Sequence, residues 1–353
     1  MSKLNRGKKT TIYDIADYCQ VSPSTVSRVL SGSDYPVSKE QREKIVEAAR
    51  VLKYVPNMLG KHLKSDRGRD IGVVIPNMSD YYGTLLRGIQ HVALAHDSQI
   101  ILCDSYRDAA KEENNVNLLL QKQVKGILIA SIDGDGKVLR QIIDKGMPVV
   151  AMEQDVDADC NRTGFNFFAG GAMAAKHLAD CGHREVAFVT SPLQRTSRKK
   201  VLAGYQQALA ERGLAIREEH LYIESYENDD DELYDFMVGK RAAEHFLSLD
   251  NPPSAVFCIN DIAAIGLIRQ LQVRKVAVPG DISVVGFDNI PFSEMITPSL
   301  TTIDQSTYDL GRLSADLLFN HVLSENQAAP AHVSLQLEPK LIVRESTATF
   351  SGN

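Results

Sequence analysis

Pro23 to Arg28 is a segment whose side chains could read the edges of DNA bases. It carries the short polar residues Ser24, Thr25 and Ser27, and it ends in the forked cation of Arg28. Short side chains let a helix approach the major groove closely, and an arginine can bond guanine through two parallel hydrogen bonds. The alternative interpretation is a small helical hairpin without a special function, because such patterns are short and common.

Two short helices joined by a tight polar turn must position this segment, and they span Thr11 to Leu30. Ser22 suits the N-cap of the second helix because its hydroxyl can accept a first-turn N–H, and Pro23 suits the first helical position. Thr11 and Asp14 have the spacing of a capping box. A third helix is expected from 38 to about 53. We therefore predict a three-helix bundle, whose small core is marginal in isolation.

The charge of the chain is distributed unevenly. Residues 1–69 carry 14 Lys and Arg against 7 Asp and Glu, whereas the remaining residues carry 25 against 38. A basic module on an acidic body is typical of a nucleic-acid-binding head, because phosphate attracts the head and repels the body. A solvated basic tail is the alternative, and the helical patterning within the basic region argues against it.

Composition excludes several classes of protein. With 353 residues, of which 44% are hydrophobic and 24% charged, the chain resembles a globular protein of two to three domains. No apolar run approaches the length of a transmembrane helix, and the basic N-terminus leads into a polar segment instead of an apolar signal core. The five cysteines are scattered without a CxxC pair. This predicts reduced thiols, no metal site and a cytoplasmic location.

From Asp70 onward, short apolar runs alternate with longer amphipathic segments. This pattern predicts parallel sheets covered by helices on both faces, in two rounds that form two similar subdomains with a cleft between them. The expected strands are 71–76, 100–103, 126–130, 148–152, 185–190, 255–259, 281–287 and 299–303, and the expected helices are 82–95, 111–123, 137–145, 169–181, 198–212, 240–249, 261–272 and 308–322. Two further strands, HVSLQLEP and KLIVRES, are expected to pair with each other.

Polar side chains follow the ends of these strands, where sheets of this kind bind ligands. They are the stretch Asn77–Tyr82, Glu153, Asn260, Asp261, Asp288 and Gln305, with Phe165 and Asn166 at a crossover between the subdomains. Carboxylates and amides beside an aromatic platform suit a polyhydroxylated or nucleoside-like ligand. The alternatives are that Asn260 caps a helix, that Asp288 starts a turn, and that Tyr81 and Tyr82 pack at a helix start.

The head sequence resembles a known family. TIYDIADYCQVSPSTVSRVLSG followed by VSKEQREKIVEAARVLKYVPN is similar to the head of the lactose-repressor/galactose-repressor family of bacterial transcription regulators, and the similarity continues to about residue 345. The resemblance implies base contacts from Pro23, Ser24 and Arg28. It implies contacts with the DNA backbone from Thr11, Ser22, Thr25, Ser31, Tyr54 and Asn57, although Ser31 stands where the family often has Asn.

Met58 to Lys64 occupies the position of the family's hinge helix. The resemblance implies that this segment pairs with its dimer mate in the minor groove, where Leu63 is inserted into the central base step beside Lys64. An apolar wedge of this kind unstacks and kinks the duplex. Two helical turns are not stable alone in water. Gly60 replaces the family's common Ala and lowers helix propensity by roughly 1 kcal/mol, so that either the hinge folds less readily or the two hinge helices pack more closely. An ordinary apolar linker residue is the alternative for Leu63.

The resemblance also covers the body and implies a periplasmic-binding-protein-like fold. Residues on the family's effector-pocket positions are Glu153, Phe165, Asn260, Asp288 and Gln305, to which Tyr81 and Tyr82 would add ring stacking. Val201 stands where the family usually has an Arg, so Arg198, Lys199 or Lys200 would have to replace that cation. The C-terminal tail has no heptads for a tetramerising coiled coil, so we expect a homodimer.

We therefore predict an α/β fold with an N-terminal three-helix helix-turn-helix head and a two-subdomain periplasmic-binding-protein-like body with parallel sheets. The expected domains are a head at 1–56, a hinge helix and linker at 57–69, and an effector-binding and dimerisation body at 70–353. Within the body, the N-subdomain is expected to take 70–164 plus 288–322, and the C-subdomain 165–287 plus 323–346.

The expected function is a ligand-responsive repressor of carbohydrate or related metabolism, associated with the bacterial nucleoid. Its partners would be a palindromic operator in double-stranded DNA, a sugar or sugar derivative as effector, and a second copy of the chain, with no cofactor, metal or membrane. Induction and corepression by the effector both fit the sequence. A transporter's solute-binding protein would share the body fold, but the basic head and the absence of a signal peptide argue against it. An enzyme is disfavoured because no nucleophile–base, P-loop or HExxH pattern is present.

Overall fold

The computed structural model describes residues 10–31, 36–54, 70–153, 158–193, 195–225, 233–323 and 332–350. The chain divides into two compact units, Met1–Arg67 and Gly68–Asn353, which contain the head and the body respectively. Each unit has its own hydrophobic core.

The head consists of the three predicted helices, α1 (Ile12–Cys19), α2 (Pro23–Leu30) and α3 (Lys39–Val51). Each helix begins after an N-cap whose hydroxyl accepts a backbone hydrogen bond, at Thr11, Ser22 and Ser38. The capping box at Thr11 is confirmed, because the Asp14 carboxylate accepts the backbone N–H of Thr11 in return. The helices enclose a small core of Ile15, Ala16, Cys19, Val26, Val29, Ile45 and Ala48.

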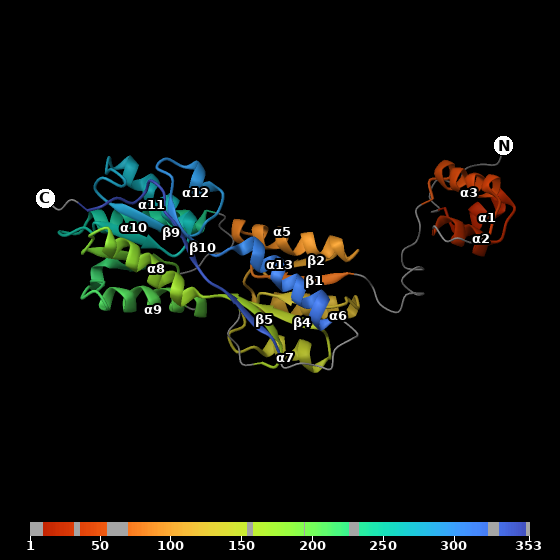
Figure 1. Cartoon of the computed structure of the whole chain (residues 1–353), viewed down its shortest axis with the longest axis horizontal. Coiled ribbons are helices and arrows are strands. Elements are labelled where there is room, and N and C mark those ends of the chain that lie inside the picture. Colours follow the sequence, from red (N-terminus) through yellow and green to blue (C-terminus); the bar gives the residue numbers. More distant parts are fainter. Residues whose placement is uncertain are drawn as a thin grey trace. The chain divides into compact units, whose positions relative to one another are not determined.

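The body contains two six-stranded sheets, one in each subdomain (Figure 1). The first has the order β11-β5-β4-β3-β1-β2 and consists of β1 (Ile71–Ile75), β2 (Ile100–Asp104), β3 (Ile127–Ile129), β4 (Val149–Met152), β5 (Asn161–Phe165) and β11 (Ser334–Leu337). The second has the order β12-β10-β9-β8-β6-β7 and consists of β6 (Val186–Thr190), β7 (Leu221–Ile223), β8 (Ala255–Cys258), β9 (Ser283–Asp288), β10 (Thr301–Asp304) and β12 (Lys340–Ile342). Neighbouring strands run parallel except β10 and β12.

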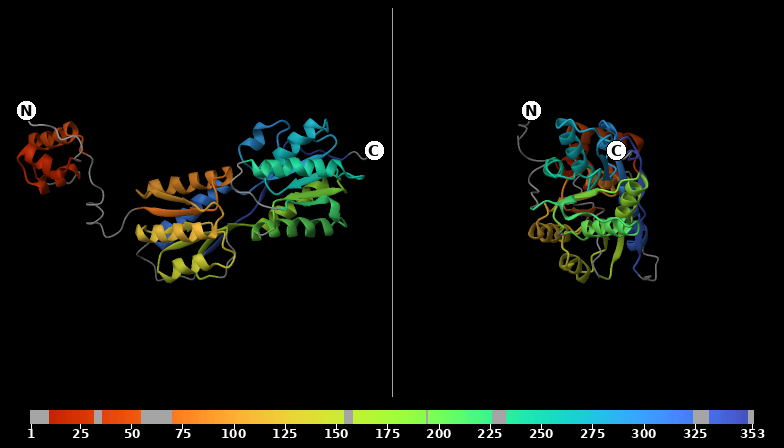
Figure 2. Two further views of the ribbon diagram at one scale, coloured as in Figure 1. Left: turned by 180° about the vertical axis from the view of Figure 1, so that it is seen from behind. Right: turned by 90° about the vertical axis from the view of Figure 1, so that its left-hand side faces the viewer.

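Helices cover both faces of each sheet, as the continuous apolar strands predict (Figures 1 and 2). On the first sheet, α5 (Asp80–Ala95) and α13 (Thr307–Leu317) share one core, and α6 (Ala109–Gln121) and α7 (Lys137–Asp144) share another. On the second sheet, α8 (Phe167–Asp180) and α9 (Thr196–Ala210) pack on one face, and α10 (Tyr234–Leu247) and α11 (Asp261–Val273) pack on the other. A short helix, α12 (Phe292–Met295), lies between β9 and β10 in the sequence.

The chain crosses between the subdomains after β5, after β10 and after β11, which corrects two expected boundaries. The segment 288–304, expected in the N-subdomain, contributes β10 to the second sheet. The segment 323–337, expected in the C-subdomain, contributes β11 to the first sheet. The two last strands therefore do not pair with each other. Glu338 and Pro339 look like a hairpin turn in the sequence, but they connect the edge strands of two different sheets.

Paired glycines allow the two helices on one face of a sheet to touch through their backbones. A Cβ atom at Gly171 of α8 would lie 2.0 Å from the carbonyl oxygen of Val201 in α9, and a Cβ at Gly204 of α9 would lie 1.9 Å from that of Phe168 in α8. No side chain fits at such distances, so the crossing requires glycine on both helices. The same reciprocal arrangement occurs at Gly239 and Gly266 between α10 and α11, and at Gly88 and Gly311 between α5 and α13.

Candidate functional site

The surface of α2 carries the residues expected to read DNA. Ser24 and Arg28 are exposed and Pro23 is half-buried, whereas Val26 and Val29 on the other face are buried in the head core. The amphipathic pattern therefore places a polar face outward, as a helix that enters a DNA groove requires.

A cluster of hydroxyl groups marks the start of α2. The Ser22 hydroxyl lies 2.7 Å from that of Ser24 and 2.8 Å from that of Thr25, and it accepts the backbone N–H of Thr25 at 3.1 Å. At the other end of the helix, the Ser31 hydroxyl donates to the carbonyl oxygen of Arg28 at 3.0 Å. The hydroxyls of Ser22, Ser24 and Thr25 thus gather at a helix start, where a phosphate oxygen would be bound.

The structure describes only some of the other residues expected to contact DNA. Thr11 is exposed, and Tyr54 is half-buried against the head core. The remaining ones, Asn57, Gly60, Leu63 and Lys64, lie outside the described residues.

A cavity of about 160 Å³ lies in the body, where side chains from both subdomains meet. Most of its lining residues lie at or after the carboxyl ends of strands or near the starts of helices, which is where ligands bind in open α/β sheets. They are Asn77, Ser79, Asp80, Tyr81, Tyr82, Arg107, Glu153, Phe167, Arg195, Ser197, Arg198, Val201, Asp235, Ile259, Asn260, Ile262, Phe287, Asp288, Ile290 and Gln305.

Most of the predicted effector residues line this cavity, namely Tyr81, Tyr82, Glu153, Asn260, Asp288 and Gln305. Phe165 does not. It is 3% exposed and packs edge-on against Phe167 and Phe287, with ring centroids 5.3 Å and 5.9 Å away. Phe165 is the last residue of β5 and belongs to the core under α8, and it is Phe167, two residues later, that reaches the cavity.

Four polar side chains form a hydrogen-bonded chain that links the two subdomains at the cavity. Asp288, at the end of β9, accepts the amide N–H of Gln305. The side-chain oxygen of Gln305 lies 3.4 Å from the Tyr81 hydroxyl, which donates to the carboxylate of Glu153 after β4. We call these four residues the polar chain.

Tyr82 has a second role beside the polar chain. Its ring is 8% exposed and packs in the core under α5, so the alternative of packing at the helix start is confirmed. Its hydroxyl lies 3.4 Å from Glu153, and its ring meets that of Tyr81 edge to face at 5.1 Å. The tyrosine thus combines a core ring with a hydroxyl at the cavity.

Burial shifts the titration of both carboxyl groups of the polar chain. It raises the pKa of Glu153, against the lowering effects of hydrogen bonds from Tyr81 and Tyr82 and of the charge on Arg195. It raises the pKa of Asp288 still further from its ordinary value, with a contribution from the nearby carboxylate of Asp261. Perturbed carboxyls of this kind gather at binding sites.

The backbone is also strained at this place. Glu153 has a φ of 57°, Asp288 a φ of 117° and Ser306, at the crossover after β10, a φ of 49°. Residues with a side chain rarely adopt the left-handed region, and they persist there when surrounding structure fixes them. Left-handed backbone thus occurs at both carboxyl groups and at a connection between the subdomains, among other positions of the chain.

Asn260 and Asp261 differ in their roles. Asn260 caps α11 by accepting the backbone N–H of Ala263 at 2.8 Å, as the structural alternative predicts, and it also lines the cavity. Asp261 is fully buried and accepts the hydroxyl of Ser293 at 2.6 Å and the backbone N–H of Ile290 at 2.9 Å. It fixes the loop that follows Asp288.

The sequence interpretation missed several charged residues of the cavity. Arg107 follows β2, Arg195 precedes α9 and Asp235 lies in the first turn of α10. The rule that polar residues after strand ends form the site would have found Arg107. The sequence gives no such signal for Asp235, because this residue lies at the start of a helix and not after a strand.

The position usually held by Arg in the resembled family is occupied by Val201, which is 1% exposed and lines the cavity. Of the three cations expected as replacements, Arg198 lines the cavity, whereas Lys199 and Lys200 are not among the lining residues. Arg198 is one turn earlier on α9, so a cation reaches the cavity from a shifted position.

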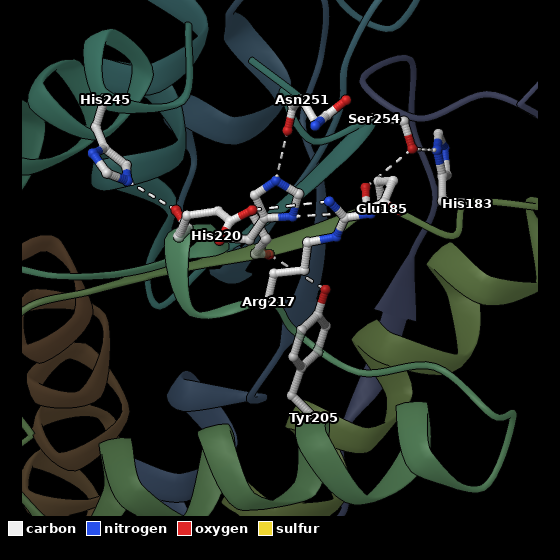
Figure 3. A network of polar contacts seen from close by, with 10 residues as sticks. His183, Glu185, Tyr205, Arg217, His220, His245, Asn251 and Ser254 are labelled. Carbon is white, nitrogen blue, oxygen red and sulfur yellow. Dashed lines mark hydrogen bonds and ion pairs between the residues drawn. The ribbon is translucent and has the colours of Figure 1, made fainter. Parts of the chain in front are cut away.

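A second polar network lies at the opposite ends of the strands in the second sheet (Figure 3). The buried His220 ring donates to the carbonyl oxygen of Asn251 at 2.9 Å, and Arg217 pairs with Glu185 at 2.6 Å. Ser254 donates to the carbonyl oxygen of Glu185 at 3.1 Å. None of these residues lines the cavity. The network therefore joins the starts of β6, β7 and β8 and has a structural role.

Two further features are absent from the described residues. No group of three or more His, Cys, Asp or Glu among them is arranged to hold a metal ion. None of the helices in the same part of the chain has the length and apolarity needed to cross a lipid bilayer.

Two family profiles match the sequence. The profile of bacterial regulatory proteins of the lacI family matches residues 11–57, and that of a periplasmic binding protein-like domain matches residues 175–347.

Full-length relatives agree with these matches. The transcriptional repressor PurR of Glaesserella parasuis is 30% identical over 346 residues, which cover 97% of this chain and 99% of the relative. The ribose operon repressor of Haemophilus influenzae is 30% identical over 341 residues, which cover 95% and 98%. The solved lac repressor dimer bound to operator and the anti-inducer ONPF is 27% identical with a TM-score of 0.82, over 97% of this chain and 100% of that chain. The chain therefore belongs to the lacI family of bacterial regulatory proteins, and it is a ligand-responsive, DNA-binding transcriptional repressor.

Proposed function

We propose that two copies of the chain bind the halves of a palindromic operator and that a sugar or sugar derivative in the cavity controls this binding. The observation that carries the proposal is the polar chain Asp288–Gln305–Tyr81–Glu153, which joins the two subdomains at the cavity. A ligand that takes hydrogen bonds from this chain must change how the subdomains are held together. Its binding is then coupled to their arrangement.

The head reads the operator through α2. Pro23, Ser24 and Arg28 contact bases, and Arg28 supplies the bidentate hydrogen bonds that distinguish guanine. The hydroxyl cluster at the start of α2, with Thr11, Ser31, Tyr54 and Asn57, contacts the DNA backbone and sets the register of the helix. Specificity then depends on few side chains, and affinity depends on many.

The segment 58–64 transmits the effector signal. It folds as a helix against its dimer mate in the minor groove, where Gly60 allows close packing and Leu63 and Lys64 contact the central step. Because binding free energies are linked, an effector that changes operator affinity by some factor must have its own affinity changed by DNA by the same factor.

Catalysis is not part of this function. The cavity is lined by carboxyl groups, arginines and tyrosines, whose hydrogen-bonding groups suit a polar ligand. The residues that line it include no nucleophile–base pair. The protein works where its DNA is, in the cytoplasm at the nucleoid.

The test is a titration of full-length protein against its operator, selected from genomic fragments, at one fixed salt concentration. Salt must be fixed because phosphate contacts make affinity strongly salt-dependent. Fluorescence anisotropy is recorded without and with each member of a sugar panel. We expect at least one sugar or sugar derivative to shift operator affinity by about fivefold or more, the low end of allosteric couplings. A fragment bound with the same affinity as scrambled DNA, whatever the ligand, would refute the proposal.

A further inference from the structure

Three arginine side chains line the same cavity. Arg107 comes from the first subdomain, after β2, and Arg195 and Arg198 come from the second, at the start of α9. Arg198 is 7% exposed, and its Nη1 donates to the carbonyl oxygen of Pro192 at 2.9 Å, which fixes the guanidinium in place.

The start of α9 adds further donors at the same wall. The N-cap residue is Arg195, and Ser197 and Arg198 of the first turn line the cavity. A guanidinium has donors only, so Arg195 cannot accept the N–H groups of the first turn as a Ser or Asp at this position would. The first turn and the positive end of the helix dipole therefore favour an acceptor that carries negative charge.

The acidic residues of the cavity do not cancel this positive character. Burial raises the pKa of Glu153 and of Asp288, and this favours their neutral forms. Asp80 and Asp235 are two further carboxyl groups in the lining, set against three arginines, and Asp235 accepts the hydroxyl of Ser191 at 2.9 Å. The charge of Arg195 lowers the pKa of Glu153 and of Tyr82. Apart from burial, the pKa of Asp288 is shifted by nearby carboxyl groups and by Gln305. The cavity thus presents cationic donors together with carboxyl and amide acceptors.

Carboxyl and amide oxygens in the cavity lining can accept hydrogen bonds from hydroxyl groups of a ligand. The side-chain oxygen of Asn77, which lines the cavity, is buried and has no hydrogen-bond partner within the described residues. A buried acceptor without a partner costs free energy that a ligand donor would recover. Asp288 offers a second acceptor nearby in the lining.

We propose that the effector is a polyhydroxylated compound with an anionic group, a carboxylate or a phosphate, and that this group binds between Arg107, Arg195 and Arg198. Its hydroxyls face Asp288, Gln305 and Asn77. The inference rests on the proposed function, because it names the chemical class of the ligand that the cavity binds. It also accounts for Val201. The cation of this cavity is Arg198, one turn closer to the start of α9, where backbone N–H groups provide further donors to an anion.

The test uses matched triplets of ligands that differ only in the anionic group. Examples are ribose, ribonate and ribose 5-phosphate, and glucose, gluconate and glucose 6-phosphate. Isothermal titration calorimetry on the full-length protein gives the Kd of each. We expect the anionic member of a triplet to bind about tenfold or more tightly than its neutral parent, since charge-assisted hydrogen bonds are roughly twice as strong as neutral ones. The carboxylate and phosphate arms distinguish a sugar acid from a sugar phosphate.

Variants locate the anionic group. Arg195→Met and Arg198→Met should each reduce the preference for the anionic member by about tenfold while changing the Kd of the neutral parent by about twofold at most. Arg195 is half-buried and serves as the second variant if Arg198→Met does not fold. The control is Arg274→Met, which removes an arginine paired with Glu244 at 2.6 Å on the surface and should leave every Kd unchanged.

The outcomes separate this inference from the proposed function. Equal or tighter binding of the neutral parents overturns the inference, and so does a panel in which no anionic member binds. If a neutral sugar then shifts operator affinity, the repressor function stands without an anionic effector. If an anionic sugar binds with the expected arginine dependence but leaves operator affinity unchanged, the inference holds and the proposed control of DNA binding fails.

Discussion

Gly171→Ala should destabilise the body although alanine favours helices. The added Cβ would lie 2.0 Å from the carbonyl oxygen of Val201 and 3.1 Å from the backbone nitrogen of Tyr205. Ordinary carbon–oxygen contacts are about 3.3 Å, so α8 and α9 must separate by more than about 1 Å. A gap of this size removes about a quarter to a half of the van der Waals attraction of each contact between the two helices.

Two opposing effects set the size of the change. Overpacking a well-packed site costs about 1 to 3 kcal/mol, occasionally more, and this crossing places backbone against backbone with nowhere to relax. Replacing glycine by alanine in a helix returns up to about 1 kcal/mol. We expect a net loss of about 2 kcal/mol in the free energy of unfolding. Because Val201 lines the cavity, effector affinity should fall as well.

The assay is urea unfolding of the full-length protein followed by far-ultraviolet circular dichroism, since the chain has no Trp. The matched control is Gly83→Ala in α5, where no atom lies within 4 Å of the added Cβ. That variant should gain about 0.5 to 1 kcal/mol from helix propensity alone. A Gly171→Ala protein as stable as the Gly83→Ala protein would refute the reasoning.

Three further perturbations test other parts of the molecule. Arg28→Ala should weaken binding to the selected operator by about 1 to 3 kcal/mol and leave effector affinity measured without DNA unchanged; equal operator affinity in a salt-controlled titration would contradict a base-reading role. Tyr81→Phe removes the hydroxyl that donates to Glu153, and the free energy of unfolding should fall by about 1 to 3 kcal/mol in urea titrations, because a buried carboxyl loses a partner. Burial raises the pKa of Asp261 from 3.8 to about 6, so its contribution to stability is present below 3.8 and is lost as the pH rises through about 6. Asp261→Asn should flatten this part of the pH dependence, and identical slopes in both proteins would contradict the assignment.

Local sequence signals predicted the head well because its structure is set locally. Ser22 and Pro23 fix the start of α2 through bonds within one turn, and alternation of Val26 and Val29 with polar residues fixes which face is buried. Most strands of the body were equally visible, since a strand buried on both faces must be apolar throughout. β5 and β7 were not expected, because β5 begins with polar residues and β7 has only three residues.

The contacts between segments distant in the sequence could not be predicted in the same way. β11 has an alternating pattern that suits any sheet edge, and only the complete fold shows that it joins β5 instead of β12. Phe165 and Phe167 are equivalent in the sequence, and the crossover geometry decides which one reaches the cavity. Arg198 was one of three possible cations, and the pitch of α9 selects it.

The placement of α13 has a consequence for the order in which the chain folds during synthesis. α13 and the π-helical turn that follows it, 318–322, supply Leu310, Ala315, Leu317, Leu318 and Phe319 to the core beneath α5. Until these residues leave the ribosome, α5 alone covers one face of the first sheet and leaves part of it exposed, although the strands β1 to β5 were made long before. The second sheet likewise lacks β12 until the end. The two subdomains therefore finish folding almost together, and a nascent chain must keep an open apolar face from aggregating meanwhile.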